Sequence, residues 1–241
     1  MHADLTNGLP LVLLPGTLCD ETLWSDVLAH DASLAARAVS LPLAGDSVEE
    51  AITRLEPQLP PRFVVAGFSL GAIVALTLVS RLSARVAGLC LIAGNGRGVP
   101  AAQIPVRRDA LRLARQTGLG AYVHEQLWPL YVAPHNSGDR AMLQHVVAMA
   151  ENAGLERYGE QLELAINRRD SLPVLHAIPQ PALIVGGAHD VINGPELQQE
   201  LAEGLPHAEL HMVQRAGHFV PLESPAELAI ALSGWLQRVD G

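Results

Sequence analysis

Apolar and polar positions alternate along this chain on two length scales. Short runs are apolar at almost every position, which is typical of strands buried on both faces of a parallel sheet. Longer amphipathic stretches lie between them and are typical of helices that cover such a sheet. We therefore predict an α/β fold with a mostly parallel central sheet and helices on both faces. The predicted strands are residues 9–14, 38–41, 63–66, 86–93, 182–185 and 208–213, and the predicted helices are residues 21–30, 47–56, 70–82, 195–204 and 225–239.

This alternation is interrupted once, between residues 98 and 176. No strand is predicted there, and four helical patterns follow one another at about 104–118, 121–130, 139–153 and 155–167. A structureless loop of that length would be uncommon in a compact domain. We therefore expect a helical lid insertion at residues 98–176, within an α/β core formed by residues 1–97 and 177–241. A plain helical subdomain is the alternative.

Composition narrows the class of protein. The chain has 241 residues, of which 49% are hydrophobic, so it is long enough to bury a substantial core. Its net charge is −9, which argues against a nucleic-acid partner. No apolar run approaches the roughly 20 residues that span a bilayer. Two cysteines and the lack of a leader-like N-terminus favour a reduced cytoplasm as the location.

The first candidate for chemistry is the serine in Gly67-Phe68-Ser69-Leu70-Gly71. This pentapeptide directly follows the predicted strand 63–66 and overlaps the start of the predicted helix 70–82. A sharp strand-to-helix turn exposes the serine oxygen, and small flanking residues let neighbouring segments pass close by. The alternative is that the two glycines merely permit a tight turn.

A nucleophilic serine needs a base, and the base needs a carboxylate that orients it. Asp190 follows the predicted strand 182–185, and His218 lies on the loop between strand 208–213 and the last helix. All three side chains therefore lie beyond the carboxyl ends of predicted parallel strands, where open α/β sheets place their sites. His189 as base and Asp170 as acid are the alternatives within the chain.

Metal and cofactor chemistry is not expected. The other histidines are scattered along the chain, and neither GxxxxGK[ST] nor GxGxxG occurs. We therefore predict no metal ion, no nucleotide and no other cofactor.

Four short motifs together make the chain resemble the α/β-hydrolase superfamily over almost its whole length. The motifs are residues 13–17 (Leu-Leu-Pro-Gly-Thr), 67–71, 187–190 (Gly-Ala-His-Asp) and 217–219 (Gly-His-Phe). The resemblance implies that Ser69 is the nucleophile, His218 the general base and Asp190 its partner. It further implies an oxyanion hole formed by the backbone amides of Thr17 and Leu70.

The expected function is hydrolysis of a small or medium carboxylic ester through an acyl-enzyme. The same three residues would also suit a lactonase, a thioesterase, a carbon–carbon bond hydrolase or an acyltransferase. A non-catalytic ligand-binding member of the fold is the alternative outside enzymes.

Two features of the sequence concern the substrate. Aromatic and apolar residues near the predicted strand ends and in the insertion could contact it, and the first helix of the insertion carries a positive stripe. The expected contacts are Leu18, Phe68, Trp128, Tyr131 and Phe219, and the stripe consists of Arg107, Arg108, Arg112 and Arg115. The stripe could bind an acyl carrier protein, in the way that the similar methyl ester hydrolases of biotin synthesis use an arginine-bearing lid. A solvated helix face is the alternative.

Overall fold

The computed structural model describes residues 8–241, and its centre is a six-stranded sheet. The strand order is β2-β1-β3-β4-β5-β6, and every neighbouring pair is parallel. The strands are β1 (Leu11–Leu14), β2 (Ala38–Ser40), β3 (Phe63–Phe68), β4 (Val86–Ile92), β5 (Ala182–Gly187) and β6 (Ala208–Val213). The chain runs outward from β1 to β2 and then crosses to β3, so the order reverses between β1 and β3. Such a reversal is where doubly wound sheets bind their ligands.

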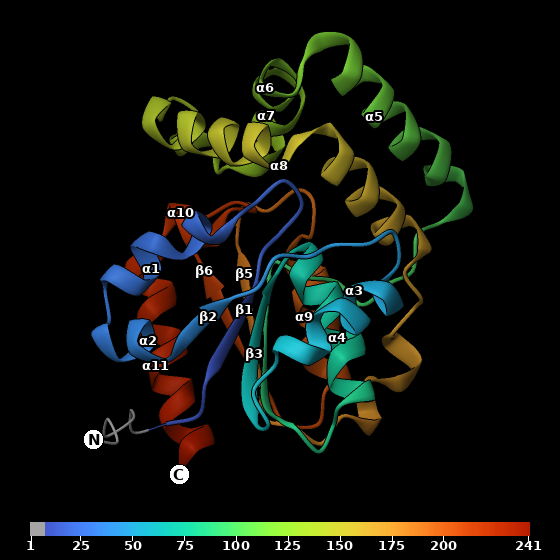
Figure 1. The fold of residues 1–241 in the computed structure, drawn as a ribbon. Helices are drawn as coiled ribbons and strands as arrows, with labels where there is room; N and C mark the ends of the chain where they lie inside the picture. The colour runs from blue at the N-terminus through green and yellow to red at the C-terminus, as the bar shows by residue number, and fades with distance from the viewer. Residues whose placement is uncertain (1–7) are drawn as a thin grey trace.

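Helices cover both faces of the sheet, which confirms the predicted fold class. Figure 1 shows α1, α2 and α11 on one side of the strands and α3, α4 and α9 on the other. The covering helices are α1 (Ser25–Ala29), α2 (Ala32–Arg37), α3 (Val48–Leu55), α4 (Leu70–Arg81), α9 (Pro195–Gly204), α10 (Val220–Glu223) and α11 (Pro225–Asp240).

Successive strand residues bury their side chains in opposite cores. In β1, Leu11 and Leu13 belong to one buried cluster, and Val12 and Leu14 belong to the other. All four are at most 1% exposed. This alternation follows from the two-residue period of a strand, and it explains why the run is apolar at every position.

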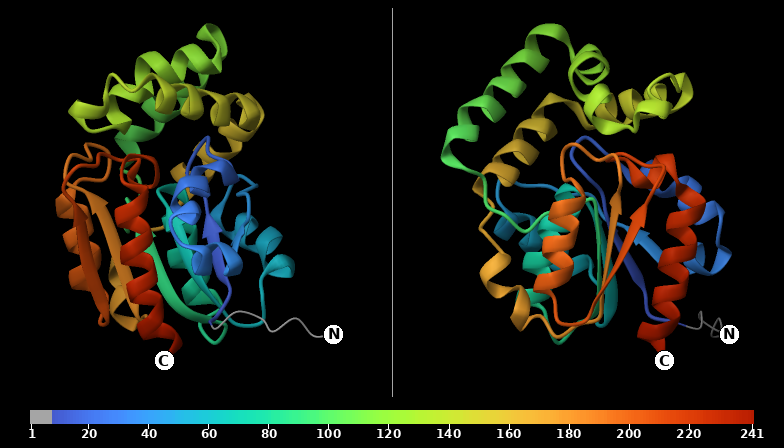
Figure 2. Two further views of the ribbon diagram at one scale, coloured as in Figure 1. Left: turned by 90° about the vertical axis from the view of Figure 1, so that its left-hand side faces the viewer. Right: turned by 180° about the vertical axis from the view of Figure 1, so that it is seen from behind.

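The segment between β4 and β5 is helical and lies beyond the carboxyl ends of the strands (Figures 1 and 2). It contains α5 (Ile104–Thr117), α6 (Leu119–Tyr122), α7 (Trp128–Tyr131) and α8 (Arg140–Asn167). α5 and α6 both pack against α8. None of the helices among residues 8–241 combines the length and the apolar character that a membrane span requires.

Several local predictions differ from the structure. The helix predicted at 21–30 is a 3-10 turn (Glu21–Trp24) followed by α1. The sequence analysis does not predict α2, whose first turn is capped by the side chain of Asp31. The helices predicted at 139–153 and 155–167 are the two halves of α8, which separate at Gly154 where φ is +77°. A π-helical turn (Val123–Leu127) interrupts the helix predicted at 121–130.

The sequence Ser224-Pro225-Ala226-Glu227 predicts an N-terminal capping box on α11, and this prediction is wrong. The side chain of Ser224 makes no capping bond, because this residue also ends α10 and its backbone (φ −145°, ψ 55°) lacks the usual extended N-cap conformation. The carboxylate of Glu227 instead lies 3.0 Å from Nε2 of His211 on β6.

Candidate active site

Ser69 occupies a strained turn between β3 and α4. Its φ of +52° and ψ of −106° lie in a region that non-glycine residues rarely adopt, at a typical cost of about 1–3 kcal/mol. A Cβ on Gly67 would lie 2.2 Å from the carbonyl oxygen of Gly71, and a Cβ on Gly71 would lie 2.1 Å from that of Leu14. Both glycines are therefore required because backbone segments pass within contact distance of them. The structure thus contains the predicted sharp turn between strand and helix, and Ser69 on this turn is partly accessible.

Ser69, His218 and Asp190 form one continuous chain of hydrogen bonds. Nε2 of His218 lies 2.9 Å from Oγ of Ser69, and Nδ1 of His218 lies 2.8 Å from Oδ2 of Asp190. His218 is 3% exposed and Asp190 4% exposed, whereas Ser69 is more accessible. The carboxylate thus fixes the orientation of the imidazole, and the second ring nitrogen is directed at the serine oxygen.

Asp190 is held in its ionised form. Burial alone would raise its pKa, but the neighbouring His218 and the hydrogen bonds that the carboxylate accepts outweigh burial and hold the pKa below its ordinary value. Oδ1 accepts from the backbone amides of Ile192 at 2.8 Å and Asn193 at 2.9 Å, while Oδ2 is left for His218. A permanently negative partner favours the histidine tautomer that can accept a proton from Ser69.

The loop that carries His218 is anchored to the end of α7. The carbonyl oxygen of Tyr131 accepts from the amides of both His218, at 2.8 Å, and Phe219, at 3.0 Å. The carboxylate of Glu223 accepts from the amide of Gly217 at 2.8 Å and from that of Ala133 at 2.7 Å. These bonds join two segments more than 80 residues apart, so the position of the imidazole depends on α7 as well as on the sheet.

The two amides expected to form an oxyanion hole lie on the loops after β1 and β3. Among residues 8–241, neither the Thr17 amide nor the Leu70 amide donates a hydrogen bond to a protein acceptor. The next amide, that of Leu18, donates to Oε1 of Gln161 on α8 at 2.8 Å. Leu18 has a φ of +59°, which is uncommon for a branched residue, and Gln161 is 3% exposed. A buried side chain from α8 therefore holds the loop that presents Thr17.

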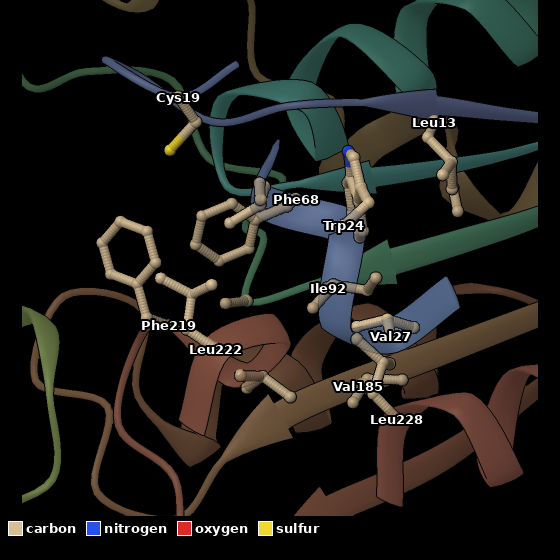
Figure 3. Close-up of a cluster of buried hydrophobic side chains, with 14 of the residues drawn as sticks. Leu13, Cys19, Trp24, Val27, Phe68, Ile92, Val185, Phe219, Leu222 and Leu228 are labelled. Atoms are coloured by element: carbon tan, nitrogen blue, oxygen red, sulfur yellow. The ribbon is translucent and has the colours of Figure 1, made fainter. Parts of the chain in front are cut away.

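A cavity of about 170 Å³ opens onto Ser69 and His218. Of the expected contacts, Phe68, Tyr131 and Phe219 line it, and so does Thr17, which carries one of the expected oxyanion-hole amides. Figure 3 shows the rings of Phe68 and Phe219 close together, and their centroids are 5.2 Å apart. The other two expected contacts, Leu18 and Trp128, do not line this cavity. The side chain of Leu18 is 3% exposed, and Nε1 of Trp128 donates to the carbonyl of Ser137 at 3.0 Å.

Five cavity residues were missed in the sequence or were given another role. Leu127, Tyr158, Leu162, Ile192 and Arg107 also line the cavity. Arg107 was grouped with the positive stripe on α5, yet it lies on the apolar side of that helix, three or four residues from Ala110 and Leu111, which pack against the core. This helical spacing was the available signal that Arg107 points inward.

The remaining candidates do not line the cavity that contains Ser69. A second cavity of about 360 Å³, lined by residues that include Cys19, Arg157 and Gln161, contains none of the three hydrogen-bonded residues. The carboxylate of Asp170 accepts from the amide of Leu172 at 2.9 Å in a local turn, and His189 lies beside His135. Cys19 and Cys90 are buried free thiols whose pKa values are raised by burial. Across residues 8–241, His, Cys, Asp and Glu side chains form no group suited to a metal ion.

The sequence profile of the alpha/beta hydrolase family matches residues 11–231. The chain belongs to the alpha/beta hydrolase family. It is 30% identical to a pimeloyl-[acyl-carrier protein] methyl ester esterase from Aromatoleum aromaticum, over 94% of this chain and 97% of that protein. It is 28% identical to the biotin biosynthesis bifunctional protein BioHC of Cellvibrio japonicus, over 95% of this chain, and it spans 48% of that longer protein.

Solved structures of this family share the fold. A thermophilic esterase from Thermogutta terrifontis superimposes with a TM-score of 0.86 at 22% identity, over 99% of this chain and 93% of that one. MenH from S. aureus superimposes with a TM-score of 0.86 at 18% identity, over 100% of this chain and 98% of that one. The expected family and fold are confirmed. The expected enzyme class, a carboxylic ester hydrolase, is confirmed by the relatives named as esterases.

Proposed function

We propose that the chain is a serine hydrolase that cleaves a small or medium carboxylic ester through an acyl-enzyme. The observation that carries this proposal is the hydrogen-bonded chain from Asp190 through His218 to Ser69. A serine hydroxyl becomes a competent nucleophile when a base can take its proton as it attacks. The strained turn at Ser69 further supports this role, because it exposes the oxygen to the cavity.

The reaction has two halves that use the same groups. Oγ of Ser69 attacks the ester carbonyl while Nε2 of His218 takes the hydroxyl proton, and a tetrahedral oxyanion forms. The carbon–oxygen bond to the alcohol then breaks, and His218 gives its proton to the departing alcohol. Water attacks the acyl-enzyme with His218 again as base, which releases the acid and restores Ser69. The chain itself supplies every group in this scheme, so it needs no cofactor.

In this proposal the backbone amides of Thr17 and Leu70 stabilise the negative charge of the tetrahedral intermediate. Both amides are without an acceptor among the described residues, and the Leu70 amide is the first of helix α4, where the helix dipole favours negative charge. Removal of one such donor in other enzymes costs about 3–4 kcal/mol of transition-state stabilisation. Residues 98–176 act as a lid in this proposal, because side chains of α5, α7 and α8 supply the outer wall of the cavity.

Labelling with a fluorophosphonate tests the activated serine directly. This reagent should modify the protein once, and the modified peptide should contain Ser69. The Ser69→Ala variant should remain unlabelled under the same conditions. A folded wild-type protein that is not labelled, or that is labelled at another serine, would contradict the proposal.

A second candidate substrate is an ester carried on an acyl carrier protein. The specific observation in its favour is the name of the relatives, several of which are pimeloyl-[acyl-carrier protein] methyl ester esterases. The exposed face of α5 offers Arg108, Arg112 and Arg115 to an acidic carrier. Two of them already have acidic partners, since Arg108 contacts Glu163 at 2.9 Å and Arg112 contacts Asp109 at 3.2 Å.

Salt dependence separates the carrier substrate from a free ester. If a carrier docks on α5, kcat/KM for a carrier-linked methyl ester should fall steeply between low and moderate salt and should fall further in an Arg112→Gln, Arg115→Gln double variant. The dimethyl ester of the same acid, which has no charge, should be unaffected by either change. Equal rates for the two substrates at all salt concentrations would reject the carrier.

A further inference from the structure

Arg107 differs from the other arginines of α5 in its surroundings. Arg108 forms two hydrogen bonds with Glu163, at 2.9 Å and 3.0 Å, and both Arg108 and Arg112 are exposed. Arg107 is half-buried and lines the cavity that contains Ser69. Its Nε is shielded from solvent and has no hydrogen-bond partner among residues 8–241. Arg107 therefore brings a charged group, with one donor that no described residue uses, to the wall of the cavity.

No acid neutralises this charge. Within the described part of the chain, no carboxylate lies within 4.0 Å of the Arg107 guanidinium. Burial lowers the pKa of Arg107, yet a guanidinium stays protonated in proteins. A second guanidinium, that of Arg168, senses this charge. Burial and, to a smaller extent, the positive charge of Arg107 lower the pKa of Arg168 to about 10. The donors Nε and Nη1 of Arg168 are occupied by the carbonyls of Arg97 and Ala165.

Such an arrangement destabilises the free protein unless an anion completes it. A partly desolvated charge without a partner is unfavourable, and a chain with net charge −9 has many carboxylates that could have been placed there. The fork of N–H donors on a guanidinium matches a carboxylate in geometry as well as in charge. The group that fits the site is thus a carboxylate brought in by a ligand.

We propose that Arg107 binds a carboxylate on the acyl part of the substrate, so that the preferred substrates are monoesters of short dicarboxylic acids. This inference rests on the proposed esterase function of Ser69. The cavity, at about 170 Å³, is smaller than the roughly 300 Å³ or more of ordinary ligand pockets, which favours a short acyl group. Leu127, Leu162 and Ile192 provide apolar contacts for the methylene groups between the two ends.

Two isosteric esters test the proposal. The methyl monoester of glutaric acid carries a carboxylate, and its primary amide analogue has the same shape without the charge. The wild-type enzyme should cleave the carboxylate ester with at least tenfold higher kcat/KM, which corresponds to about 1.4 kcal/mol. Arg107→Gln should remove this preference by lowering kcat/KM for the carboxylate ester tenfold or more, while the amide ester changes less than threefold.

Two further variants control for charge and for geometry. Arg81→Gln removes one positive charge at the end of α4, from an exposed arginine that is paired with Glu56, and should leave both esters unaffected. Arg107→Lys keeps the charge but loses the fork, so it should recover only part of the preference. The melting temperature of each variant shows whether it is folded.

The outcomes distinguish failure of the carboxylate site from failure of the proposed esterase function on which it rests. If the wild-type enzyme cleaves both esters equally, or Arg107→Gln slows both equally, the carboxylate site is rejected while Ser69 remains the nucleophile. If Arg107→Gln impairs only a carrier-linked ester, the anion is the carrier's phosphate and the proposal is likewise overturned. If neither ester is cleaved and a fluorophosphonate does not label Ser69, the esterase function itself fails.

Discussion

Replacing Ser69 with alanine should lower kcat for a short neutral ester roughly a million-fold, which is the loss seen when a serine nucleophile is removed elsewhere. The variant lacks the oxygen that forms the acyl-enzyme. Only Oγ is removed, and Ser69 is only partly buried, so the melting temperature should change little. Steady-state hydrolysis of a chromogenic acetate ester measures the loss.

His218→Ala is the matched variant for this experiment. The serine and the histidine act as one unit, so the double variant Ser69→Ala, His218→Ala should be no slower than either single variant. Additive losses would show that the two residues do not cooperate, and the hydrogen bond of 2.9 Å between them would then have no catalytic meaning. Retention of more than about one per cent of the activity in Ser69→Ala would remove it as nucleophile.

Replacing Asp190 with asparagine should lower kcat roughly ten-thousand-fold. The amide has nearly the shape of the carboxylate, but its NH₂ group can donate a hydrogen bond to Nδ1 of His218. The imidazole would then carry its proton on Nε2 and could not accept one from Ser69. Binding should be less affected, so the loss should appear in kcat more than in KM. Unchanged kcat in a folded variant would show that the orienting carboxylate lies elsewhere.

The same substitution should change how stability depends on pH. The pKa of Asp190 is held below its ordinary value in the folded protein, so the ionised carboxylate stabilises the fold at pH values above about 4, where the unfolded chain is also ionised. This contribution is lost as the pH falls through the lower, folded-state pKa. Urea denaturation should therefore show the free energy of unfolding of the wild-type protein approaching that of Asp190→Asn as the pH is lowered below 4. A constant difference would contradict the assigned shift.

The parallel sheet and the three hydrogen-bonded residues could be predicted because local signals mark them. The buried strands are apolar at every position, and Ser69, Asp190 and His218 each follow a strand in a short loop rich in small residues. The carboxyl ends of parallel strands meet at one edge, so sequence alone places these side chains on the same side of the sheet. What sequence could not supply was the distance between them.

The walls of the cavity were predicted less well because they depend on how the helical segment packs. Trp128 directly follows a π-helical turn and does not line the cavity, and no local sequence pattern predicts such a turn. Leu18 adopts a positive φ, and its backbone amide is bonded to Gln161, which is 143 residues away in the chain. No local pattern indicates such a contact. Arg107 was grouped by charge with its neighbours, although its helical position favoured the opposite face. The helical spacing of Arg107 is thus a usable local signal, whereas the conformation at Leu18 depends on a contact that is distant in the chain.

The bond between the Leu18 amide and Gln161 has a thermodynamic consequence. If the Thr17 amide stabilises the oxyanion as proposed, the placement of this donor and the docking of α8 on the loop after β1 are linked equilibria. Linkage is reciprocal, so whatever tightens α8 against the loop improves the donor, and whatever occupies the donor tightens α8 by the same free energy. A ligand that mimics the tetrahedral intermediate would therefore close the helical segment more firmly than a substrate that only fills the cavity. Closure of the helical segment would then indicate that the bound ligand resembles the transition state, and not only that the cavity is filled.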